Sequence, residues 1–517
     1  METVDICLLV EGTYPFVAGG VSSWVHDMLL GQPHLRFAIL NIGSHPAAYG
    51  EPRYQLPDNV TGLHKMFCQE AALALDATAR ADMTAQIRQI RQRADARPKP
   101  SRMLAAFRRM HLEDEVDAEL LGDLSSGDLT IAEFLHGRAS FELLTEIAEK
   151  VAPDAPFLDL FWHFRAIHVP LLRILSKPLV EASCYHAVST GYAGLLAAVW
   201  SHRSGRPLAV TEHGIYARER DLELSRVDWI RDHHQDEVGS AAWTWAPRTS
   251  PLRGLWSRFF RTLSRVAYRQ ASRIVTLSDI NRRKQVADGA PEGKIEIVPN
   301  GVDLKAEQID ADARQSDEAR DIIPLQTRPV RVGFVGRVVP IKDVITFIKA
   351  CDLALGIVEL DVRIIGPAEE DPEYAKRCRT LVELLRRTDQ IKFLGSQPPA
   401  QIYPDLDLVV LTSFSEGQPL VILEAYAEGL PVIASDVGAC REMIEGRLAE
   451  DRAFGPSGIV TRVAAPKETA AAMVMLAKDS RLRRRMGMAG RKRVTTFYQR
   501  REMLAKYRAL YGAMVSP

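Results

Sequence analysis

The sequence lacks several features that would narrow its function at once. Its 517 residues include only six cysteines, and no two of them form a CxxC pair. Scattered cysteines are typical of reduced, mostly buried thiols in the cytosol and argue against a disulfide framework or a zinc site. Net charge is lacking as well, because 66 Lys and Arg balance 66 Asp and Glu. The overall charge therefore does not favour nucleic acid or an acidic substrate.

Long hydrophobic runs are also missing. No run approaches the roughly 18 apolar residues that a membrane-spanning helix needs. The N-terminal METVDICLLV has neither the basic start nor the long apolar stretch of a signal peptide, and a strand fits it better. We therefore expect a cytoplasmic chain. The loop that follows lacks GxGxxG, and no GxxxxGK[ST] occurs, so neither a dinucleotide fingerprint nor a P-loop is present.

What the sequence does contain is an alternation of short apolar strands and helical segments. Strand, glycine-rich loop, helix and strand follow one another over residues 4–43, and a fresh unit of this kind begins at RVGFVGR, 331–337. Such alternation is typical of parallel sheets covered on both faces. The sequence predicts an α/β protein with two Rossmann-like domains facing across a cleft. We expect them at 1–310 and 325–490, followed by a C-terminal helix at 491–517 that packs back toward the N-terminal domain.

Residues from about 69 to 180 interrupt this alternation and are predicted to be a mostly helical insertion in the N-terminal domain. Residues 80–109 hold nine basic and two acidic residues, whereas residues 111–160 hold two basic and thirteen acidic ones. Two interpretations stay open: helical segments that face each other with complementary charge, or a docking surface for a partner.

The segment SFSEGQPLVILEAYAEGLPVIAS, 413–435, carries the strongest candidate site. Glu416 would lie in the loop after a strand and Glu424 about a turn into the next helix, near the strand ends where α/β folds bind ligands. Carboxylates there can accept hydrogen bonds from sugar or ribose hydroxyls. Free amides at the start of a helix can bind phosphate, and the backbone that opens this helix is that of Gly417, Gln418, Pro419 and Leu420. An ordinary loop with solvated glutamates is the alternative.

Three further loops at expected strand ends carry candidate residues. GRVVPIKD contains Arg337 and Lys342, which suit a diphosphate. EGTYPFVAGGV contains Gly19 and Gly20, where a backbone can approach a ligand closely. TEHG contains His213, which could contact a substrate, although a lone histidine is more often structural.

Together these segments resemble a GT-B glycosyltransferase of family GT4. The two glutamates with seven residues between them, the Arg/Lys pair, PNGVD at 299–303 and SDVGACREMI at 435–444 all match that family's pattern. The longer strings EGTYPFVAGGVSSWVHDML and TEHGIYARERDLEL resemble the cytosolic glycosyltransferases of Pel exopolysaccharide assembly in bacterial biofilms. The helical insertion departs from minimal members of the family but is similar to that group.

The resemblance implies a role for each residue. Arg337 and Lys342 would neutralise the diphosphate of a UDP-sugar donor as it leaves, Glu416 would hold sugar hydroxyls, and Glu424 ribose hydroxyls. Gly19 and Gly20 would lie against the donor, and His213 would contact the donor sugar. Configuration would be retained and no metal or other cofactor needed.

The same resemblance implies an acceptor and partners. The acceptor would be a growing Pel-type polysaccharide, and the partners inner-membrane Pel assembly proteins, at the inner face of that membrane. Two alternatives stay open: a sugar-nucleotide epimerase on the same fold, or a non-catalytic sugar-nucleotide-binding scaffold subunit of a membrane polysaccharide complex.

Three weaker signals need a structure to interpret them. Asp405 and Asp407 form a DxD, a metal-binding pattern elsewhere, but they directly precede an expected buried strand. Residues 478–501 hold ten basic residues and one acidic one, which predicts either a solvated helix face or contact with an anionic membrane. A Trp-rich stretch could line an acceptor groove or fill the core, and it contains Trp229, Trp243, Trp245 and Trp256.

Overall fold

The computed structural model describes residues 3–69, 77–96, 99–113, 116–225, 227, 229–230, 250–304 and 328–515. These residues form two compact units. The first comprises Met1–Val275, Lys284–Glu296 and Arg508–Pro517, and the second comprises Thr276–Arg283 and Ile297–Tyr507. Trp243, Trp245 and residues 311–324, which separate the two expected domains, lie outside the described residues.

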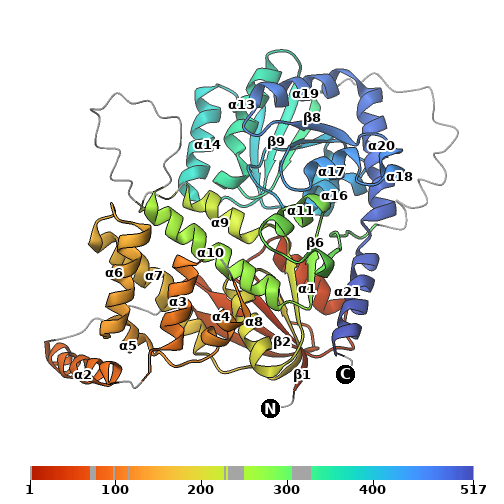
Figure 1. The fold of residues 1–517 in the computed structure, drawn as a ribbon. Coiled ribbons are helices and arrows are strands. Elements are labelled where there is room, and N and C mark those ends of the chain that lie inside the picture. Colours follow the sequence, from red (N-terminus) through yellow and green to blue (C-terminus); the bar gives the residue numbers. More distant parts are fainter. Residues whose placement is uncertain are drawn as a thin grey trace. The chain divides into compact units, whose positions relative to one another are not determined.

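The first unit is built on a seven-stranded sheet with the order β3-β2-β1-β4-β5-β6-β7 (Figure 1). Its neighbouring strands from β3 to β5 pair in parallel. The strands are β1 (Val4–Glu11), β2 (Phe37–Gly43), β3 (Val60–Phe67), β4 (Ala182–Ala187), β5 (Leu208–Glu212), β6 (Arg273–Thr276) and β7 (Ile295–Ile297).

Helices cover this sheet and form the insertion. The helices that alternate with its strands along the chain are α1 (Gly20–Leu30), α8 (Tyr192–Ser204), α9 (Tyr216–Leu224), α10 (Pro251–Gln270) and α11 (Asp279–Ala287). The helices between β3 and β4 are α2 (Ala77–Asp95), α3 (Arg102–Leu112), α4 (Ala118–Leu124), α5 (Ile131–His136), α6 (Arg138–Val151) and α7 (Phe157–Leu175). One core of buried apolar side chains runs from the sheet into this insertion, so the insertion is part of the unit's packing.

The second unit is built on a six-stranded parallel sheet with the order β10-β9-β8-β11-β12-β13. Its strands are β8 (Val330–Val335), β9 (Leu360–Ile365), β10 (Ile391–Gly395), β11 (Leu408–Leu411), β12 (Val432–Ser435) and β13 (Gly458–Thr461). Its helices are α13 (Val344–Leu355), α14 (Pro372–Leu384), α15 (Pro399–Ile402), α16 (Leu420–Ala427), α17 (Cys440–Glu445), α18 (Ala449–Arg452), α19 (Pro466–Lys478), α20 (Ser480–Phe497) and α21 (Arg500–Val515).

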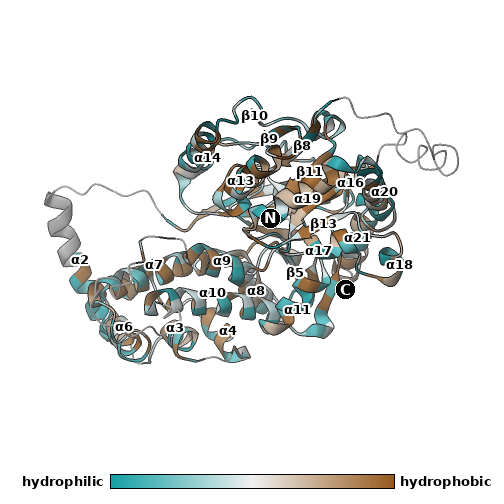
Figure 2. Cartoon of the chain, turned by 90° about the horizontal axis from the view of Figure 1, so that it is seen from above, coloured by the Kyte–Doolittle hydropathy of each residue, from teal (hydrophilic) through white to brown (hydrophobic). Residues whose placement is uncertain are grey.

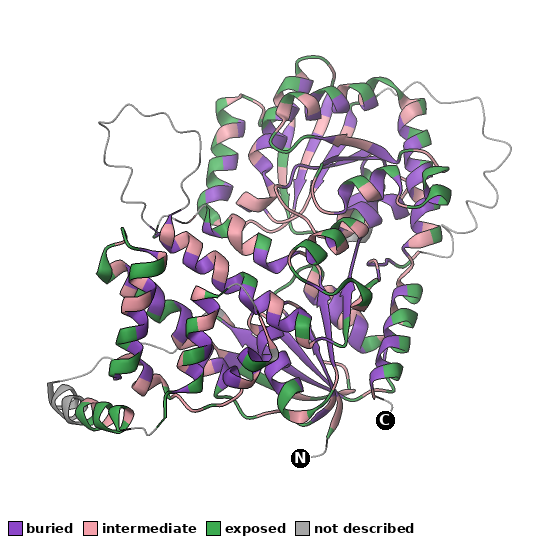
Figure 3. Cartoon of the chain, viewed as in Figure 1, coloured by how far each residue is buried: buried purple, intermediate pink, exposed green. Residues whose placement is uncertain are grey.

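Burial and hydropathy explain why these segments form sheets and covering helices. The central strands are apolar in Figure 2 and buried in Figure 3, as parallel strands covered on both faces must be. The prediction of two Rossmann-like parallel-sheet domains is therefore confirmed. All six cysteines are free and five are buried, as expected.

The C-terminal helices depart from the expected boundary at residue 490. That residue lies inside α20, which continues to Phe497 because no proline interrupts it. The break between α20 and α21 lies beside Val302, which bonds to the residues on either side of it. The Val302 N–H donates to Tyr498 O at 2.9 Å, and the Val302 carbonyl accepts from Arg500 N at 3.1 Å. Residues from Arg508 onward belong to the first unit, where Tyr511 Oη lies 2.6 Å from His186 Nδ1.

No helix in the described part of the chain is both long and apolar enough to cross a membrane.

Candidate functional site

The strand order of the second sheet places a polar cluster where ligands usually bind. The order reverses between β8 and β11, and parallel sheets bind ligands beyond the strand ends at such a point. Lys342 follows β8 and Glu416 follows β11, and Lys342 Nζ donates to Glu416 Oε1 at 2.5 Å. Ser413 Oγ donates to the same oxygen at 2.5 Å. The pair is largely shielded, with the two side chains 18% and 9% exposed, so its mutual attraction is little screened.

Hydrogen bonds to backbone carbonyls hold the two loops of this pair together. Phe414 N donates to Ile341 O at 2.9 Å, and Thr412 Oγ1 donates to Asp343 O at 2.9 Å. Asp343 adopts a left-handed conformation with φ of 48° and caps α13 by accepting from Thr346 N. A non-glycine residue is uncommon there, and its cap hydrogen bond offsets part of the strain. The geometry of Lys342 is thus determined by the fold around it.

A third loop, after β12, packs directly on the backbone of Glu416. Gly438 has φ of +50°, and a Cβ added there would lie 1.9 Å from Glu416 O. The next residue, Ala439, donates its N–H to Gly417 O at 2.8 Å. Glycine is therefore required at 438 by both conformation and space. This explains part of the SDVGACREMI motif.

Arg337 lies in the same loop region as Lys342 but pairs with another acid. Its Nη1 is 2.6 Å from both carboxylate oxygens of Glu370, and both side chains are partly exposed. A half-exposed pair of this kind is weak. An incoming diphosphate could therefore replace Glu370 as the partner of Arg337 at small cost.

Glu424 lies in α16 and is held by Tyr403, whose hydroxyl donates to Glu424 Oε2 at 2.5 Å. Burial raises the pKa of Glu424, and the Tyr403 hydrogen bond and nearby Arg500 oppose that rise. The helix begins at Leu420 after Pro419, which makes no side-chain cap, so the first amides of α16 lack a side-chain acceptor there.

The other two residues of this loop differ in their partners. Gly417 receives the Ala439 hydrogen bond. Gln418 is buried and directed at the PNGVD segment: its Oε1 accepts from Asn300 N at 2.6 Å and its carbonyl from Asn300 Nδ2 at 3.3 Å. The side chain of Gln418 therefore holds the loop in place. The predicted role in phosphate binding concerns only its backbone.

In the first unit, Gly19 and Gly20 lie at the start of α1, after β1. Gly19 is the N-cap residue with extended backbone, and a Cβ added there would meet no atom within 4 Å. Gly20 is the first helical residue. Packing within the unit therefore does not require glycine at position 19.

His213 follows β5 and packs edge-on against Trp24, with ring centroids 4.7 Å apart. Burial lowers the pKa of His213 to about 4, so its ring is neutral at physiological pH. Its Nε2 is buried and has no hydrogen-bond partner in the described part of the chain. A buried polar atom without a partner is costly in a folded protein, which makes His213 a candidate for contact with a ligand.

Sequence reasoning missed two buried or half-buried acids in this unit. Glu212, beside His213, accepts from Thr190, Gln285, Tyr268 and the backbone of Tyr216, while its burial raises its pKa. Glu11 ends β1, next to β4 where this sheet's order reverses, and accepts from Tyr216 Oη at 2.8 Å and Ser189 Oγ at 3.2 Å. The only sequence signal for either is a carboxylate directly at the end of an apolar strand.

The structure shows the partners of the two acids in the DxD motif. Asp405 and Asp407 precede β11, at the opposite end of that strand from Glu416, and both are paired with arginines. Asp405 pairs with Arg331 and Arg363, and Asp407 pairs with Arg328 at 2.7 Å. Among the described residues there is no group of three or more His, Cys, Asp or Glu that could hold a metal ion.

Most basic residues of the 478–501 segment are exposed, which agrees with a solvated helix face, and contact with a membrane stays a prediction. Two of the ten lie in the interior instead. Arg493 is fully buried, pairs with Asp451 and donates to Ser457 Oγ at 2.8 Å. Arg483 is 8% exposed and donates to Leu476 O at 2.6 Å. These side chains belong to the interior because enough acceptors surround them there.

The charged segments of the insertion pair with each other. Arg108 pairs with Glu146 at 2.9 Å, and Arg109 with Glu119 at 2.6 Å. This agrees with the first interpretation, in which the segments face each other. Of the tryptophans, Trp256 is buried and donates to His163 Nδ1 at 2.9 Å, whereas Trp229 stacks on His163 and is 55% exposed.

Family comparisons divide the chain in the same two parts. Residues 4–293 match the family described as "Domain of unknown function (DUF3492)", and residues 315–493 match "Glycosyl transferases group 1".

Curated relatives match mainly part of the chain. It is 31% identical over 212 residues to a D-inositol 3-phosphate glycosyltransferase of Nocardia farcinica, covering 39% of this chain and 43% of the relative. It is 26% identical over 322 residues to an MMP alpha-(1->4)-mannosyltransferase of Mycolicibacterium hassiacum, covering 61% and 67%. The match thus spans less than half the length of the inositol phosphate enzyme.

Solved structures match over the whole chain. HepE of Anabaena, in complex with UDP and glucose, superposes with a TM-score of 0.56 at 15% identity, covering 99% of this chain and 100% of HepE. Sucrose-phosphate synthase of Thermosynechococcus elongatus superposes with a TM-score of 0.54 at 14% identity, covering 98% and 100%. At such low identity the likeness shows the fold alone, and that fold is GT-B.

Proposed function

Because the chain belongs to the family described as "Domain of unknown function (DUF3492)" and carries a group 1 glycosyltransferase domain, we propose that it is a retaining, metal-independent glycosyltransferase. It moves a hexose or N-acetylhexosamine from a UDP-sugar to a growing exopolysaccharide of Pel type, in the manner of PelF. The observation that carries this proposal is the shielded Lys342–Glu416 pair at the switch point of the second sheet.

The pair suits a donor because it places a cation next to an acid. The cation, Lys342, can bind the diphosphate, and the acid, Glu416, can bind the sugar. A bound diphosphate takes over Lys342 and Arg337 as anion partners. Glu416, then released from Lys342, accepts hydrogen bonds from the sugar hydroxyls. Fixed cations at the leaving group stabilise the charge that develops on it, which is usually the largest catalytic contribution.

Three other groups complete the donor site in this proposal. The first amides of α16, at Leu420 and beyond, bind a phosphate. Glu424, positioned by Tyr403, accepts from the ribose hydroxyls. Neutral His213 contacts the donor sugar, and the backbone of Gly19 and Gly20 lies against the donor.

The reaction follows from this set of groups. The acceptor hydroxyl oxygen bonds to the anomeric carbon as the bond from that carbon to the diphosphate oxygen breaks. The hydroxyl proton passes to the departing diphosphate. Attack and departure share one face of the sugar, so the anomeric configuration is retained.

The relatives support the donor class and widen the choice of sugar. HepE has been crystallised with UDP-glucose, and the curated relatives are named for inositol phosphate and mannosyl transfer. The donors to compare are therefore UDP-glucose, UDP-GlcNAc, UDP-GalNAc and GDP-mannose. The Pel assignment depends on the strings EGTYPFVAGGVSSWVHDML and TEHGIYARERDLEL, and with it come the inner-membrane assembly proteins as partners.

The first test is thermal unfolding of the full chain with these donors, UDP, ADP and GDP. A ligand at a hundredfold excess over its Kd stabilises the native state by about 2.7 kcal/mol. We expect UDP and one UDP-sugar to raise the Tm, and Lys342→Met to abolish the shift. Arg441→Gln, at an exposed arginine of α17, is the matched control and keeps it.

The second test separates transfer from the alternatives. Release of UDP from the stabilising donor, lost in Glu416→Gln with folding retained, supports the enzyme. Conversion of the donor to an epimer without acceptor would instead favour an epimerase. Donor binding with no turnover under any acceptor would favour a scaffold subunit, and no shift with any nucleotide would contradict the donor site.

A further inference from the structure

The first sheet has a switch point of its own, and a carboxylate lies there. The strand order β3-β2-β1-β4-β5 reverses between β1 and β4, and Glu11 is the last residue of β1. Ligands of α/β proteins bind beyond the carboxyl ends of the strands at such a point. In the second sheet the corresponding point holds the Lys342–Glu416 pair. Transfer of a sugar needs an acceptor as well as a donor, and Glu11 occupies the matching position in the other sheet.

Glu11 is held in place by side chains that follow the neighbouring strands. Tyr216 Oη donates to Glu11 Oε1 at 2.8 Å, and Ser189 Oγ donates to Glu11 Oε2 at 3.2 Å. Ser189 follows β4, and Tyr216 is the first residue of α9 after β5. The Tyr216 N–H in turn donates to Glu212 at 3.2 Å. The carboxylate is thus fixed by contacts from the ends of three adjacent strands.

The glycine at position 191 leaves the space for this arrangement. A Cβ added there would lie 2.2 Å from the Tyr216 ring and 2.6 Å from Glu11 Oε2. Because the interior of a protein is closely packed, any larger residue would push the two side chains apart. Gly191 therefore preserves the contact between Tyr216 and Glu11.

Glu11 keeps the capacity to bind a further group. Its third donor is the Ala193 N–H at 3.4 Å, which is long for a hydrogen bond. An ionised carboxylate can accept about four hydrogen bonds. All three donors are uncharged, so none of these contacts neutralises the carboxylate, and Glu11 is only partly buried. Its Oε1, which accepts only from Tyr216 among these donors, can accept another hydrogen bond.

The two segments that meet at Glu11 also carry hydrogen-bonding atoms without partners. Thr13 Oγ1, two residues after Glu11, is buried and has no hydrogen-bond partner in the described part of the chain, and the same is true of Arg220 Nε. Arg220 lies about one turn after Tyr216 in α9, with its guanidinium 5.2 Å from the centre of the Tyr216 ring, and its Nη1 pairs with Glu223. Buried polar atoms in native proteins are usually paired, so these two indicate a ligand.

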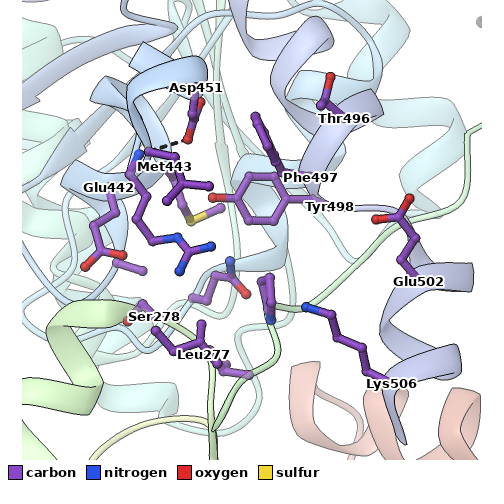
Figure 4. Close-up of a pocket in the computed structure, with 16 residues that line it drawn as sticks. Leu277, Ser278, Glu442, Met443, Asp451, Thr496, Phe497, Tyr498, Glu502 and Lys506 are labelled. Atoms are coloured by element: carbon purple, nitrogen blue, oxygen red, sulfur yellow. Dashed lines mark hydrogen bonds between the residues drawn. The ribbon is translucent and has the colours of Figure 1, made fainter. Parts of the chain in front are cut away.

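The cavity of the second unit is too small to hold a sugar. Figure 4 shows the side chains that line it, among them Glu442 and Asp451. Its volume is about 130 Å³, whereas sites for small-molecule ligands begin at roughly 300 Å³. Both acids are bound within the unit, Asp451 by Arg493 and Glu442 by the N–H groups of Asp279 and Ile280. This cavity therefore does not serve the acceptor.

We propose that Glu11 binds a hydroxyl group of the acceptor sugar, with Tyr216 and Arg220 beside it. The inference deepens the proposed function and rests on it, because only a transferase has an acceptor. The sugar hydroxyl donates to Glu11 Oε1, and an oxygen of the same sugar accepts from Arg220. Hydrogen bonds of this kind, with one charged partner, are the strong ones.

The same assignment gives a role to two strings of the sequence. Glu11 begins EGTYPFVAGGVSSWVHDML, and Tyr216 and Arg220 belong to TEHGIYARERDLEL. The hydrogen bond between Tyr216 and Glu11 joins these strings in the fold. The segments on which the choice of a polysaccharide acceptor depends therefore meet at the residue that we assign to the acceptor.

The test measures release of UDP by the full chain, with the stabilising donor alone and with added glucose, N-acetylglucosamine or N-acetylgalactosamine. These sugars are the probes because a growing polysaccharide ends in the kind of sugar that its donor supplies. We expect at least one of them to accelerate release. Glu11→Gln should lower kcat/KM for that sugar about tenfold or more, the range for a hydrogen bond to a charged group. The loss should fall on the acceptor KM, since the contact already exists in the bound state.

Two further variants separate acceptor binding from a structural role. Glu181→Gln makes the same change at an exposed acid before β4, at the opposite end of that strand, and should leave the acceptor KM unchanged. Tyr216→Phe keeps the acid and removes the hydroxyl that positions it, so the acceptor KM should rise about threefold, as for an uncharged hydrogen bond. Circular dichroism checks folding, and if Glu11→Gln does not fold, an unchanged KM in Tyr216→Phe overturns the inference.

The remaining outcomes distinguish this inference from the proposed function. In Glu11→Gln, UDP should still raise the Tm and release with the donor alone should be unchanged. An unchanged acceptor KM in the folded variant would overturn the inference, and so would loss of the UDP shift, which would assign Glu11 to the donor. Wild-type release that no added sugar accelerates would overturn it as well. No release of UDP from any donor would instead contradict the proposed function, and the inference would fall with it.

Discussion

At the scale of single residues, several charged groups have roles that only their neighbours define. Arg493 and Arg441 are both arginines of the second unit with an aspartate partner. Arg493 is fully buried and its partner Asp451 is 3% exposed, whereas Arg441 and Asp436 are 50% and 45% exposed. Removing one side of a buried pair leaves an uncompensated charge, and removing one side of an exposed pair leaves a solvated one.

We therefore predict that Arg493→Met destabilises the second unit by about 3–5 kcal/mol. Part of that cost is the loss of hydrogen bonds to the carbonyls of Ile444 and Gly455. Arg441→Gln should cost less than about 1 kcal/mol. Urea unfolding of the two variants measures the difference in the free energy of unfolding. Equal losses of stability would contradict the prediction and mean that Asp451 is solvated in the folded chain.

At the scale of elements, the buried histidines determine how packing responds to acid. His168 in α7 has its Nδ1 2.7 Å from Phe164 O, and because a carbonyl only accepts, that nitrogen carries the proton. His186 in β4 lies between Thr211 and Tyr511. Burial lowers the pKa of each ring to about 3. Both rings are therefore neutral in the folded chain, whereas they titrate near 6.5 once unfolded.

The sign of the pH effect follows from this difference. Between pH 6.5 and 3 the unfolded chain binds more protons, so folded stability is complete above about 6.5 and falls as the pH drops. Each ring contributes about 1.4 kcal/mol per pH unit in that window. His168→Gln should flatten the dependence of the urea midpoint between pH 7 and 4.5 by one proton. An unchanged slope would show that His168 titrates in the folded state.

The strands were predictable where they are mostly apolar, as in β1, β2 and β8. The strands β3 and β13 were not anticipated. In β3 only Met66 is buried, and the adjacent His64 and Lys65 are exposed, while β13 is only four residues long. Both lie at sheet edges, where one neighbour is missing and burial no longer demands an apolar run.

At the scale of the whole molecule, the cysteines report how completely the two units are packed. Cys7 and Cys440 are fully buried, and burial raises the pKa of each thiol. Cys68 is the partly exposed one, and burial nevertheless raises its pKa to about 12. Thiols react as thiolates, so all six should be slow to react in the native chain.

We predict that a chromogenic disulfide reagent at pH 8 labels less than one thiol per native chain within minutes and all six in guanidinium chloride. Cys68→Ser should remove whatever fast labelling remains, which is the control for its exposure. Rapid labelling of several thiols in the native chain would contradict the packing of the cores.

The sequence by itself determined the α/β alternation, the two parallel sheets and the loops that carry Arg337, Lys342, Glu416 and Glu424. It could do so because strand periodicity and loop position depend on local order along the chain. Only the tertiary structure decided which partners these side chains take. It joined Lys342 to Glu416, gave Glu370 to Arg337 and Tyr403 to Glu424, and buried Arg493. Those pairings join residues 21 to 74 positions apart, and distances across a fold are not written in local sequence.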